Sequence, residues 1–414
     1  MNIEAKEAGF DAARLERITE HLERNYIRQG KIAGCQTLVA RHGHVAYFKS
    51  LGMADRERET PMADDTIFRL YSMTKPITSV ALMTLYEEGY FQLNDPVHRI
   101  IPEWRDMGVY VSGEGENIVK RPPKSPMTFR HLLSHQSGLS YGDGLARLVG
   151  VDIPLHPADA AYSALGVQRG RDDTLRSFVE RMANVPLRFD PGEKWMYSYA
   201  TDVCGYLVEA ISGMPFDQYL RERIFGPLGM KDTAFFVPPE KANRLAAGYW
   251  RRPRDKSLNL MDDPQTSEYL KEPKMFAGGS GLVGTTADYL RFTEMLRRGG
   301  ELDGARILGP RTIEMMRQNH LTGGKELSEM AIGVFSETPY DGIGFGLGFA
   351  MTLDTVAAGT IGAGDFYWGG AASTIFWVDD EEDLCVIFMT QLIPSATFNF
   401  RGQLKNIVYS SIVH

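Results

Sequence analysis

Strand-like segments lie near both ends of the chain and helical segments lie between them, and this order constrains the fold more than any other feature. Short runs of β-branched and aromatic residues bounded by turn residues are typical of strands. Such runs occupy residues 35–40, 45–48, 346–352, 373–378 and 384–390. Apolar residues recur at helical spacing in 10–29 and 398–413. These segments predict one antiparallel sheet, built from N- and C-terminal hairpins and flanked by the terminal helices.

The middle of the chain predicts a second lobe that is mostly helical. Thr128 is expected to cap a short helix, because a threonine oxygen accepts a bond from a free backbone N–H. Further helices are expected at 174–182, 204–211 and 216–224. The span 236–275 is rich in Pro, Asp, Arg and Lys and predicts a long surface excursion.

Beyond this span, Thr286 is expected to cap a helix over 286–296, and another helix is expected at 310–318. The predicted fold class is therefore α+β, an α/β sandwich with an inserted helical lobe. Residues 1–92 and 271–414 would form the α/β domain with the antiparallel sheet, and 93–270 the inserted domain.

Composition narrows the classes of function. The net charge of −8 argues against a nucleic-acid partner, whose binding domain is normally basic. No apolar run approaches the length of a membrane span. The polar N-terminus lacks the apolar core of a signal peptide, which predicts a cytoplasmic protein. Three separated cysteines without metal spacing, Cys35, Cys204 and Cys385, are expected to be buried free thiols.

Residues 68–89 hold the only Ser-x-x-Lys of the chain, Ser72 to Lys75, at the expected start of an apolar helix that ends near Gly89. Pro76 is tolerated in a first helical turn, because the first N–H groups have no partner to lose. Positions i and i+3 share a face of a helix, so the Ser72 hydroxyl and the Lys75 amine can meet. A nearby base makes a serine nucleophilic. A capped helix start with a solvated lysine explains the same four residues.

Two further segments could complete such a site. Tyr197 lies between an Asp-Pro-Gly turn and a helix, and beside a lysine cation a phenol can accept a proton. Trp368, Gly369 and Gly370 precede a predicted strand, where glycines let a backbone approach a ligand closely. The N–H groups of Ala371 and Ser72 could then form an oxyanion hole. Taken singly, a packed tyrosine and a glycine-rich bulge explain these segments as well.

Together, the three segments resemble the serine β-lactamase and penicillin-binding-protein superfamily, and within it the class C β-lactamase-like esterases known as family VIII carboxylesterases. The order Ser72-x-x-Lys75, Tyr197-Ser-x and Trp368-Gly-Gly agrees over roughly residues 10–410. Flanking phrases agree as well, among them His-Gln-Ser-Gly-Leu at 135–139 and Gly-Ser-Gly-Leu at 279–282.

The resemblance implies a β-lactamase/transpeptidase-like fold and an acyl-enzyme mechanism without metal or organic cofactor. Ser72 would attack a small or short-chain ester, Lys75 and Tyr197 would share the general-base role, and the N–H groups of Ser72 and Ala371 would hold the oxyanion. His135 is expected to have a structural role.

Two departures from the family pattern favour an esterase over a β-lactamase. Trp368 stands where β-lactamases carry a lysine, and it offers an apolar wall in place of a cation. Tyr199 stands where the second motif normally ends in asparagine. We therefore expect Trp368, Gly369, Gly370 and Tyr199 to contact substrate.

Three other functions are possible on the same scaffold. An acyltransferase, which the resemblance to lovastatin-type acyltransferases suggests, would form the same acyl-enzyme and differ only in the acceptor. Weak β-lactamase or D-alanyl peptidase activity is a second alternative, and a non-enzymatic binding module is a third. The expected partner is a small-molecule ester, and no prediction of oligomeric state follows.

Overall fold

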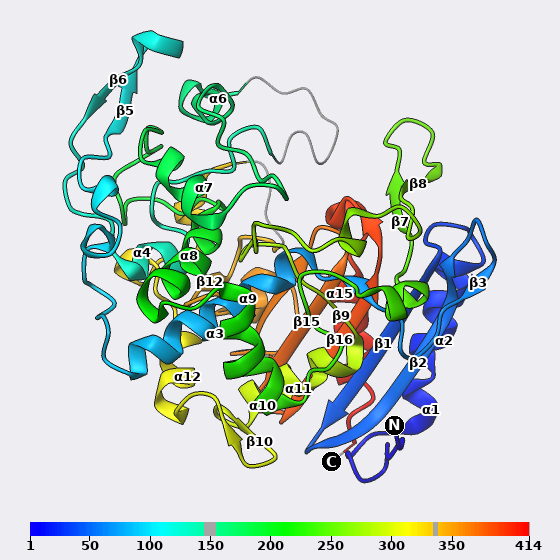
Figure 1. The fold of residues 1–414 in the computed structure, drawn as a ribbon. Coiled ribbons are helices and arrows are strands. Elements are labelled where there is room, and N and C mark those ends of the chain that lie inside the picture. Colours follow the sequence, from blue (N-terminus) through cyan, green and yellow to red (C-terminus); the bar gives the residue numbers. More distant parts are fainter. Residues whose placement is uncertain (145–154, 334–337, 414) are drawn as a thin grey trace.

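The computed structural model describes residues 1–144, 155–333 and 338–413 (Figure 1). Its helices are α1 Ala12–Leu15, α2 Arg17–Leu22, α3 Thr74–Glu87, α4 Phe129–Leu133, α6 Pro157–Ala164, α7 Leu175–Met182, α8 Ala200–Ser212, α9 Phe216–Leu220, α10 Gly226–Leu228, α11 Thr286–Arg297, α12 Pro310–Met316, α13 Leu327–Met330, α14 Thr355–Ala358 and α15 Phe400–Tyr409. Its longer strands are β1 Gly34–Arg41, β2 His44–Asp55, β14 Phe366–Gly370, β15 Thr374–Asp379 and β16 Leu384–Thr390. The shorter strands are β3 Thr60–Pro61, β4 Phe68–Arg69, β5 Val109–Ser112, β6 Val119–Arg121, β7 Gly248–Arg251, β8 Leu258–Asp262, β9 Val283–Gly284, β10 Glu301–Leu302, β11 Ala305–Arg306, β12 Ile343–Phe345, β13 Ala350–Thr352 and β17 Leu392–Ile393.

One eight-stranded sheet joins the two ends of the chain in the order β12-β13-β14-β15-β16-β1-β2-β3. The N-terminal hairpin meets the C-terminal strands where β1 pairs antiparallel with β16, with Leu38 opposite Ile387. The predicted antiparallel sheet from both ends is thus confirmed. The termini also meet, because Phe10 forms a β-bridge with Ile412 (Figure 1).

Helices cover both faces of the sheet. Successive strand residues point to opposite faces, so neighbouring Ile375 and Phe376 face different layers. Phe376 contacts Tyr289 of α11, with ring centroids 5.1 Å apart. Phe388 lies opposite Ile375 and contacts Phe400 of α15 at 4.8 Å. All residues of β1, β15 and β16 are buried, as expected for strands covered on both faces.

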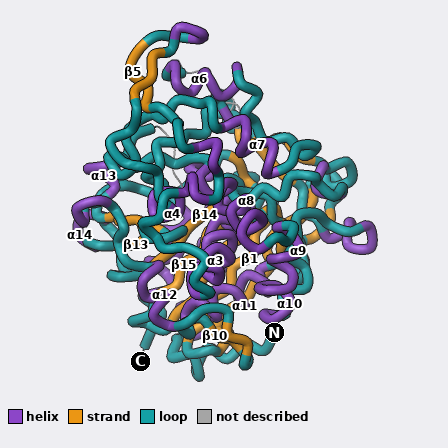
Figure 2. Tube along the Cα trace, turned by 60° about the vertical axis from the view of Figure 1, so that its left-hand side comes forward, coloured by secondary structure: helices purple, strands orange, loops and turns teal. Residues whose placement is uncertain are grey.

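The region between β4 and β9 is rich in helices and loops. Both views place α4, α6, α7 and α8 together, with the hairpin β5–β6 at their outer end (Figures 1 and 2). Thr128 caps α4 as expected, because its side chain accepts the His131 N–H at 3.3 Å. The helix predicted over 204–211 is longer than expected because α8 begins at Ala200, and it ends at Gly213, whose φ is 70°. The division at residues 93 and 270 stays a prediction.

Three predictions about individual segments need correction. Part of 236–275 is not a surface excursion: β7 and β8 form a hairpin, and β7 pairs in parallel with β17, with Tyr249 opposite Leu392. Residues 346–352 are not one strand, because a turn containing Gly348, with φ 97°, separates β12 from β13. The cap of α11 is Thr285 and not Thr286. In adjacent threonines either hydroxyl can cap, and that of Thr286 instead donates to the Gln36 side chain at 2.6 Å.

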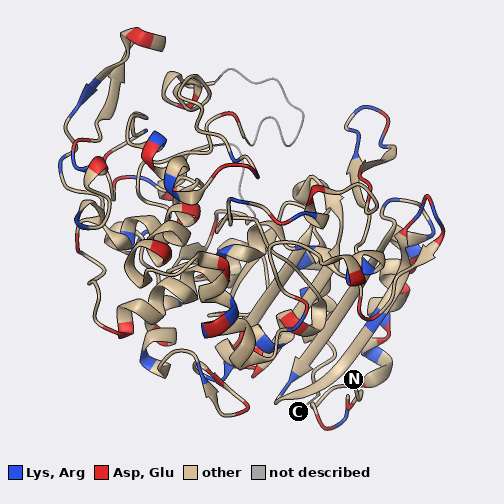
Figure 3. Ribbon diagram, viewed as in Figure 1, with Lys and Arg blue, Asp and Glu red and all other residues tan. Residues whose placement is uncertain are grey.

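The charged surface residues and the cysteines show no unusual grouping among the residues that the structure describes. Acidic and basic residues are mixed along the helices and loops seen in Figure 3. None of the described helices combines the length and the apolarity that a membrane crossing requires. The three cysteines are buried and free, as predicted.

Candidate active site

Ser72 lies in a single 3₁₀ turn, Tyr71–Met73, that leads directly into α3. The turn begins at Tyr71, whose φ of 44° lies in a region that residues other than glycine rarely adopt. Strained backbone of this kind clusters at functional sites. The Ser72 side chain is buried. The predicted helix start at Ser72 is therefore confirmed, and so is its end at Gly89, where φ is 83°.

Lys75 lies in the first turn of α3, on the same face as Ser72, and only 2% of its surface is exposed. Its Nζ donates a hydrogen bond to Ser72 Oγ at 3.1 Å and another to the carbonyl oxygen of Gly279 at 2.6 Å. The hydroxyl and the amine are thus within proton-transfer distance.

Tyr197 brings the second predicted segment to the same amine. It lies in the loop before α8, and Lys75 Nζ is 4.6 Å from the centroid of its ring. Its hydroxyl accepts a hydrogen bond from Trp368 Nε1 at 3.1 Å. Ser72, Lys75, Tyr197 and Trp368 therefore form one connected cluster, drawn from three segments that are far apart in the sequence.

His135 packs beside this cluster as a neutral side chain. Its ring is 5.0 Å from that of Tyr197, and its Nδ1 is 3.2 Å from Ser198 Oγ. Burial, and next the charge of Lys75, hold the pKa of His135 well below its usual value. A neutral imidazole here packs against the loop of Tyr197 and carries no charge near neutral pH.

The third segment forms β14, whose last residue touches the nucleophile turn. A Cβ added at Gly370 would lie 2.5 Å from the carbonyl oxygen of Leu70, two residues before Ser72. It would also lie 2.3 Å from Thr374 Oγ1, in the facing strand β15. Only glycine lets the strand approach this closely. Ala371 follows directly, and the pairing of its N–H with that of Ser72 as an oxyanion hole stays a prediction.

Gly370→Ala is therefore expected to destabilise the protein by about 1–3 kcal/mol, as overpacking does, and to lower the turnover of the folded enzyme. Urea unfolding and ester hydrolysis per folded molecule measure the two effects. Gly309→Ala is the control, because its added Cβ would meet only the flexible side chain of Glu87, at 3.2 Å. Equal behaviour of the two variants would contradict the close approach of β14.

Trp368 and Tyr199 are both more buried than a wall of a substrate cleft requires. The Trp368 indole is fully buried between Tyr197 and Phe345, each with a ring centroid 5.3 Å away. The Tyr199 ring lies 4.7 Å from that of Tyr141 and 4.9 Å from the guanidinium of Arg169. Their direct contact with substrate stays a prediction.

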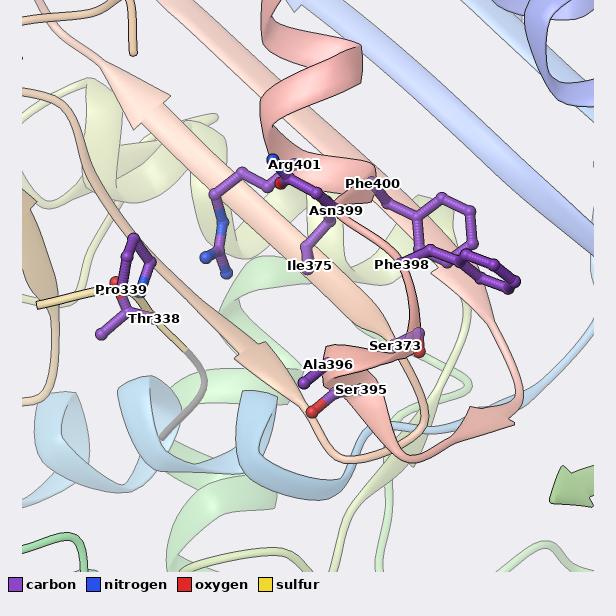
Figure 4. Close-up of a pocket in the computed structure, with 10 residues that line it drawn as sticks. All are labelled: Thr338, Pro339, Ser373, Ile375, Ser395, Ala396, Phe398, Asn399, Phe400 and Arg401. Atoms are coloured by element: carbon purple, nitrogen blue, oxygen red, sulfur yellow. The ribbon is translucent and has the colours of Figure 1, made fainter. Parts of the chain in front are cut away.

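Gly369 leaves room for an arginine. A Cβ added there would lie 3.1 Å from Arg401 Nη2, which donates a hydrogen bond to the Trp368 carbonyl oxygen at 3.1 Å. Arg401 also lines a cavity of about 320 Å³ beside the turn that follows β14 (Figure 4). Its lining residues are Thr338, Pro339, Ser373, Ile375, Ser395, Ala396, Phe398, Asn399, Phe400 and Arg401. Ser373, one of these lining residues, follows Ala371 by two residues.

Three residues that support the site had no predicted role: Gly279, which was noted only as part of a flanking phrase, Asp202 and Arg169. Gly279 holds the Lys75 amine, and Asp202 accepts the Gly279 N–H at 3.0 Å and pairs with Arg169 at 2.7 Å. One sequence signal was available for Asp202, which is a lone carboxylate among the apolar residues at the start of α8. Within 1–144, 155–333 and 338–413, no three acidic, His or Cys side chains are grouped to hold a metal ion.

Comparison with known proteins finds one family across nearly the whole chain. The family described as "Beta-lactamase" matches residues 19–405. Esterase EstB of Burkholderia gladioli is 33% identical over 399 residues, which cover 92% of this chain and 90% of that protein.

Solved structures share the fold over a similar length. EstCE1, described as a hydrolase with promiscuous acyltransferase activity, superposes with a TM-score of 0.78 and 29% identity, covering 96% of this chain and 99% of its own. Simvastatin synthase (LovD) from Aspergillus terreus gives a TM-score of 0.79 at 25% identity, covering 96% of this chain and 98% of its own.

Proposed function

The chain belongs to the beta-lactamase family, and from this premise we propose that Ser72 is the nucleophile of a family VIII serine carboxylesterase. The protein is a serine hydrolase that acts on carboxylic esters. The observation that carries the assignment of the nucleophile is the 3.1 Å hydrogen bond from Lys75 Nζ to Ser72 Oγ, with Tyr197 against the same amine.

In the acylation step, Ser72 Oγ attacks the carbonyl carbon of the ester. Its proton passes to the Lys75–Tyr197 pair, in which the amine and the phenol ring lie against one another. The oxyanion that forms accepts bonds from the N–H groups of Ser72 and Ala371, which can contribute about 10²–10³ in rate. The tetrahedral intermediate then collapses, the bond to the alkoxy oxygen breaks, and the pair returns the proton to the leaving alcohol.

In the deacylation step, water attacks the carbonyl carbon of the acyl-enzyme. Tyr197, next to the Lys75 amine, takes the proton of the water. When the bond between the carbonyl carbon and Ser72 Oγ breaks, the proton returns to Oγ and the carboxylic acid leaves. The pair thus acts as base and then as acid in each half of the cycle.

The preferred substrates are small or short-chain esters. In place of the lysine of the β-lactamase motif the chain has Trp368, whose indole donates to Tyr197. This position therefore has an indole and lacks the lysine cation that would bind the carboxylate of a β-lactam. Turnover of nitrocefin and of D-alanyl peptides is expected to be weak beside ester hydrolysis.

Hydrolysis of p-nitrophenyl esters from acetate to octanoate tests this function. We expect a burst of p-nitrophenol equal to the enzyme concentration wherever deacylation is the slower step, and the highest kcat/KM for the short acyl chains. Flat chain-length dependence would contradict the short-chain preference. Absence of turnover for the whole series would contradict the esterase.

We expect the cavity of Figure 4 to hold the longer acyl chains. Ala396 lies exposed on its lining, so Ala396→Trp can narrow it without disturbing the core. The variant is expected to lower kcat/KM for octanoate about tenfold, the effect of a few lost apolar contacts, and to leave acetate nearly unchanged. Ala13→Trp, at an exposed position of α1, is the control. An equal loss for both esters would show that the cavity does not select chain length.

Acyl transfer is the second candidate, because EstCE1 and simvastatin synthase share this fold over nearly the whole chain. Transfer replaces water by an alcohol in the deacylation step. Adding a small primary alcohol and measuring the ratio of new ester to free acid separates the two. A ratio that exceeds the molar ratio of alcohol to water by orders of magnitude would favour the transferase.

A cytoplasmic location is part of the proposal. Its support is that Cys35, Cys204 and Cys385 are buried, free thiols, as expected in a reducing compartment.

A further inference from the structure

We propose that Asp202 is a positioning residue that sets the Lys75 amine against Ser72, acting through the backbone of Gly279 and held in turn by Arg169. The inference rests on the proposed roles of Ser72 and Lys75. Asp202 itself touches neither of the reacting atoms.

Gly279 links the carboxylate to the amine through its own peptide groups. Its N–H donates to Asp202 Oδ1 at 3.0 Å, and its carbonyl oxygen accepts from Lys75 Nζ at 2.6 Å. A single residue thus joins the carboxylate to the base. Any displacement of the Gly279 N–H moves the carbonyl that holds the amine.

The loop around Gly279 is held between the two helices that carry the site. On the side of α3, Thr78 Oγ1 donates to the Gly278 carbonyl at 2.7 Å, and the Leu282 N–H donates to Thr74 Oγ1 at 3.2 Å. On the side of α8, a Cβ added at Gly278 would lie 2.7 Å from the Thr201 carbonyl oxygen. Asp202 is the side chain of α8 that bonds to the loop at Gly279.

Asp202 is fully buried at the start of α8 and its charge is compensated. Arg169 Nη2 donates to its second oxygen at 2.7 Å, while the arginine side chain keeps 27% exposure. The guanidinium lies 5.3 Å from the ring of Tyr141 and 4.9 Å from that of Tyr199. A buried carboxylate is costly unless it is paired and hydrogen-bonded, and here each oxygen has one partner. Arg169 therefore fixes which oxygen faces Gly279.

This arrangement has a consequence for proton transfer. A lysine amine has three positions for hydrogens and its lone pair, and the Gly279 carbonyl occupies one of them. With that hydrogen fixed, the lone pair of the neutral amine can face Ser72 Oγ, which lies 3.1 Å from Nζ. The Oγ–H bond breaks as this lone pair takes the proton. A misplacement of about 1 Å at such a contact can cost about 10²-fold in rate.

The first test is Asp202→Ala, assayed on p-nitrophenyl acetate. We expect kcat to fall about 10²-fold with little change in KM, because the variant misplaces a base and leaves the ester subsites intact. Asp55→Ala is the matched control. Asp55 is equally buried, accepts the Arg58 backbone N–H at 3.2 Å and its guanidinium at 2.6 Å, and lies on β2, four strands from β14.

The second test separates charge from position. In Asp202→Asn the amide oxygen can still accept the Gly279 N–H, but the amide nitrogen then faces Arg169, donor against donor. The double variant Asp202→Asn with Arg169→Gln replaces that clash by an amide–amide bond and restores a neutral pair. We expect the double variant to recover kcat to within a few-fold of wild type.

The pH profile adds a readout that a merely structural role would not move. The acid limb of kcat/KM reports the Lys75–Tyr197 pair in the free enzyme. Asp202→Asn leaves the Arg169 charge uncompensated near this pair, which disfavours protonation, so the limb moves to lower pH. In the double variant it returns. Tyr141, whose ring centroid lies 5.7 Å from the Lys75 amine, and His135, whose pKa the Lys75 charge lowers, also face this amine, and Tyr199 lies beside Arg169; all three are unchanged in both variants.

Ser72→Ala in the same series keeps two failures apart. If it retains activity, the proposed function fails and the inference fails with it. If it is inactive while Asp202→Ala loses no more kcat than Asp55→Ala, the inference alone is overturned. A loss in Asp202→Ala that lies wholly in KM would also overturn it. So would a double variant as slow as Asp202→Ala, or an acid limb that stays at its wild-type pH in Asp202→Asn.

Discussion

Ser72→Ala is expected to abolish ester turnover, by at least about 10³-fold, and to leave the fold intact. The hydroxyl supplies the oxygen that becomes the acyl ester, so no neighbouring group can replace it. Deleting one oxygen from a small, buried side chain removes only the hydrogen bond from Lys75 and almost no packing. Hydrolysis of p-nitrophenyl acetate measures the first effect, and the melting temperature measures the second.

Ser79→Ala is the matched control for this prediction. Ser79 is buried on the same helix, one turn beyond Lys75, and takes no part in the site. We expect the control to keep its activity per folded molecule. A Ser72→Ala enzyme with activity near that of Ser79→Ala would mean that the nucleophile lies elsewhere.

Lys75→Met has the second largest expected effect, a loss of about 10²–10⁴-fold, which is the usual contribution of a general base. Methionine keeps an unbranched chain of similar length and lacks the nitrogen. The loss should lie in kcat, because the Lys75 amine bonds to Ser72 and Gly279 and Lys75 is not among the residues that line the cavity.

Stability should change little in the same variant. The Gly279 carbonyl loses a partner, which costs about 1–3 kcal/mol, while removal of a buried amine relieves its desolvation. Lys405→Met is the contrast. Lys405 is equally buried and pairs with Asp365, whose charge would be left uncompensated, so about 3–5 kcal/mol of stability should be lost. Urea unfolding of both variants checks this. A Lys75→Met enzyme that stays active would contradict the general-base role.

Local features of the fold and of the site could be predicted because they depend on residues near one another in sequence. Ser72 and Lys75 meet through the i, i+3 geometry of one helix start. The first hairpin follows from two short apolar runs around a turn, in which His42 and Gly43 have φ values of 55° and 80°. Tyr197 could be named as a candidate from its place between an Asp-Pro-Gly turn and a helix, and its general-base role follows only from the family resemblance.

The joining of the two terminal hairpins in one sheet was predicted, but the particular contacts between distant segments could not be. The partner of β7 is contributed by Leu392 and Ile393, about 140 residues further on, and periodicity carries no such information. The burial of Trp368 and its bond to Tyr197 depend on how the loop before α8 lies against β14, while the expected apolar wall stays a prediction. Asp202 and Gly279 meet only in the folded chain, and the bond between them uses a backbone N–H that any residue but proline has.

The most direct test of the central claim is to locate the covalent bond. The enzyme would be inactivated with a p-nitrophenyl alkylphosphonate, digested, and sequenced by tandem mass spectrometry, with Ser72→Ala treated in parallel. We predict one phosphonyl group per chain, on Ser72, a parallel loss of esterase activity, and no adduct on Ser72→Ala. A stoichiometric adduct on any other residue, or inactivation of the enzyme without modification of Ser72, would contradict the account.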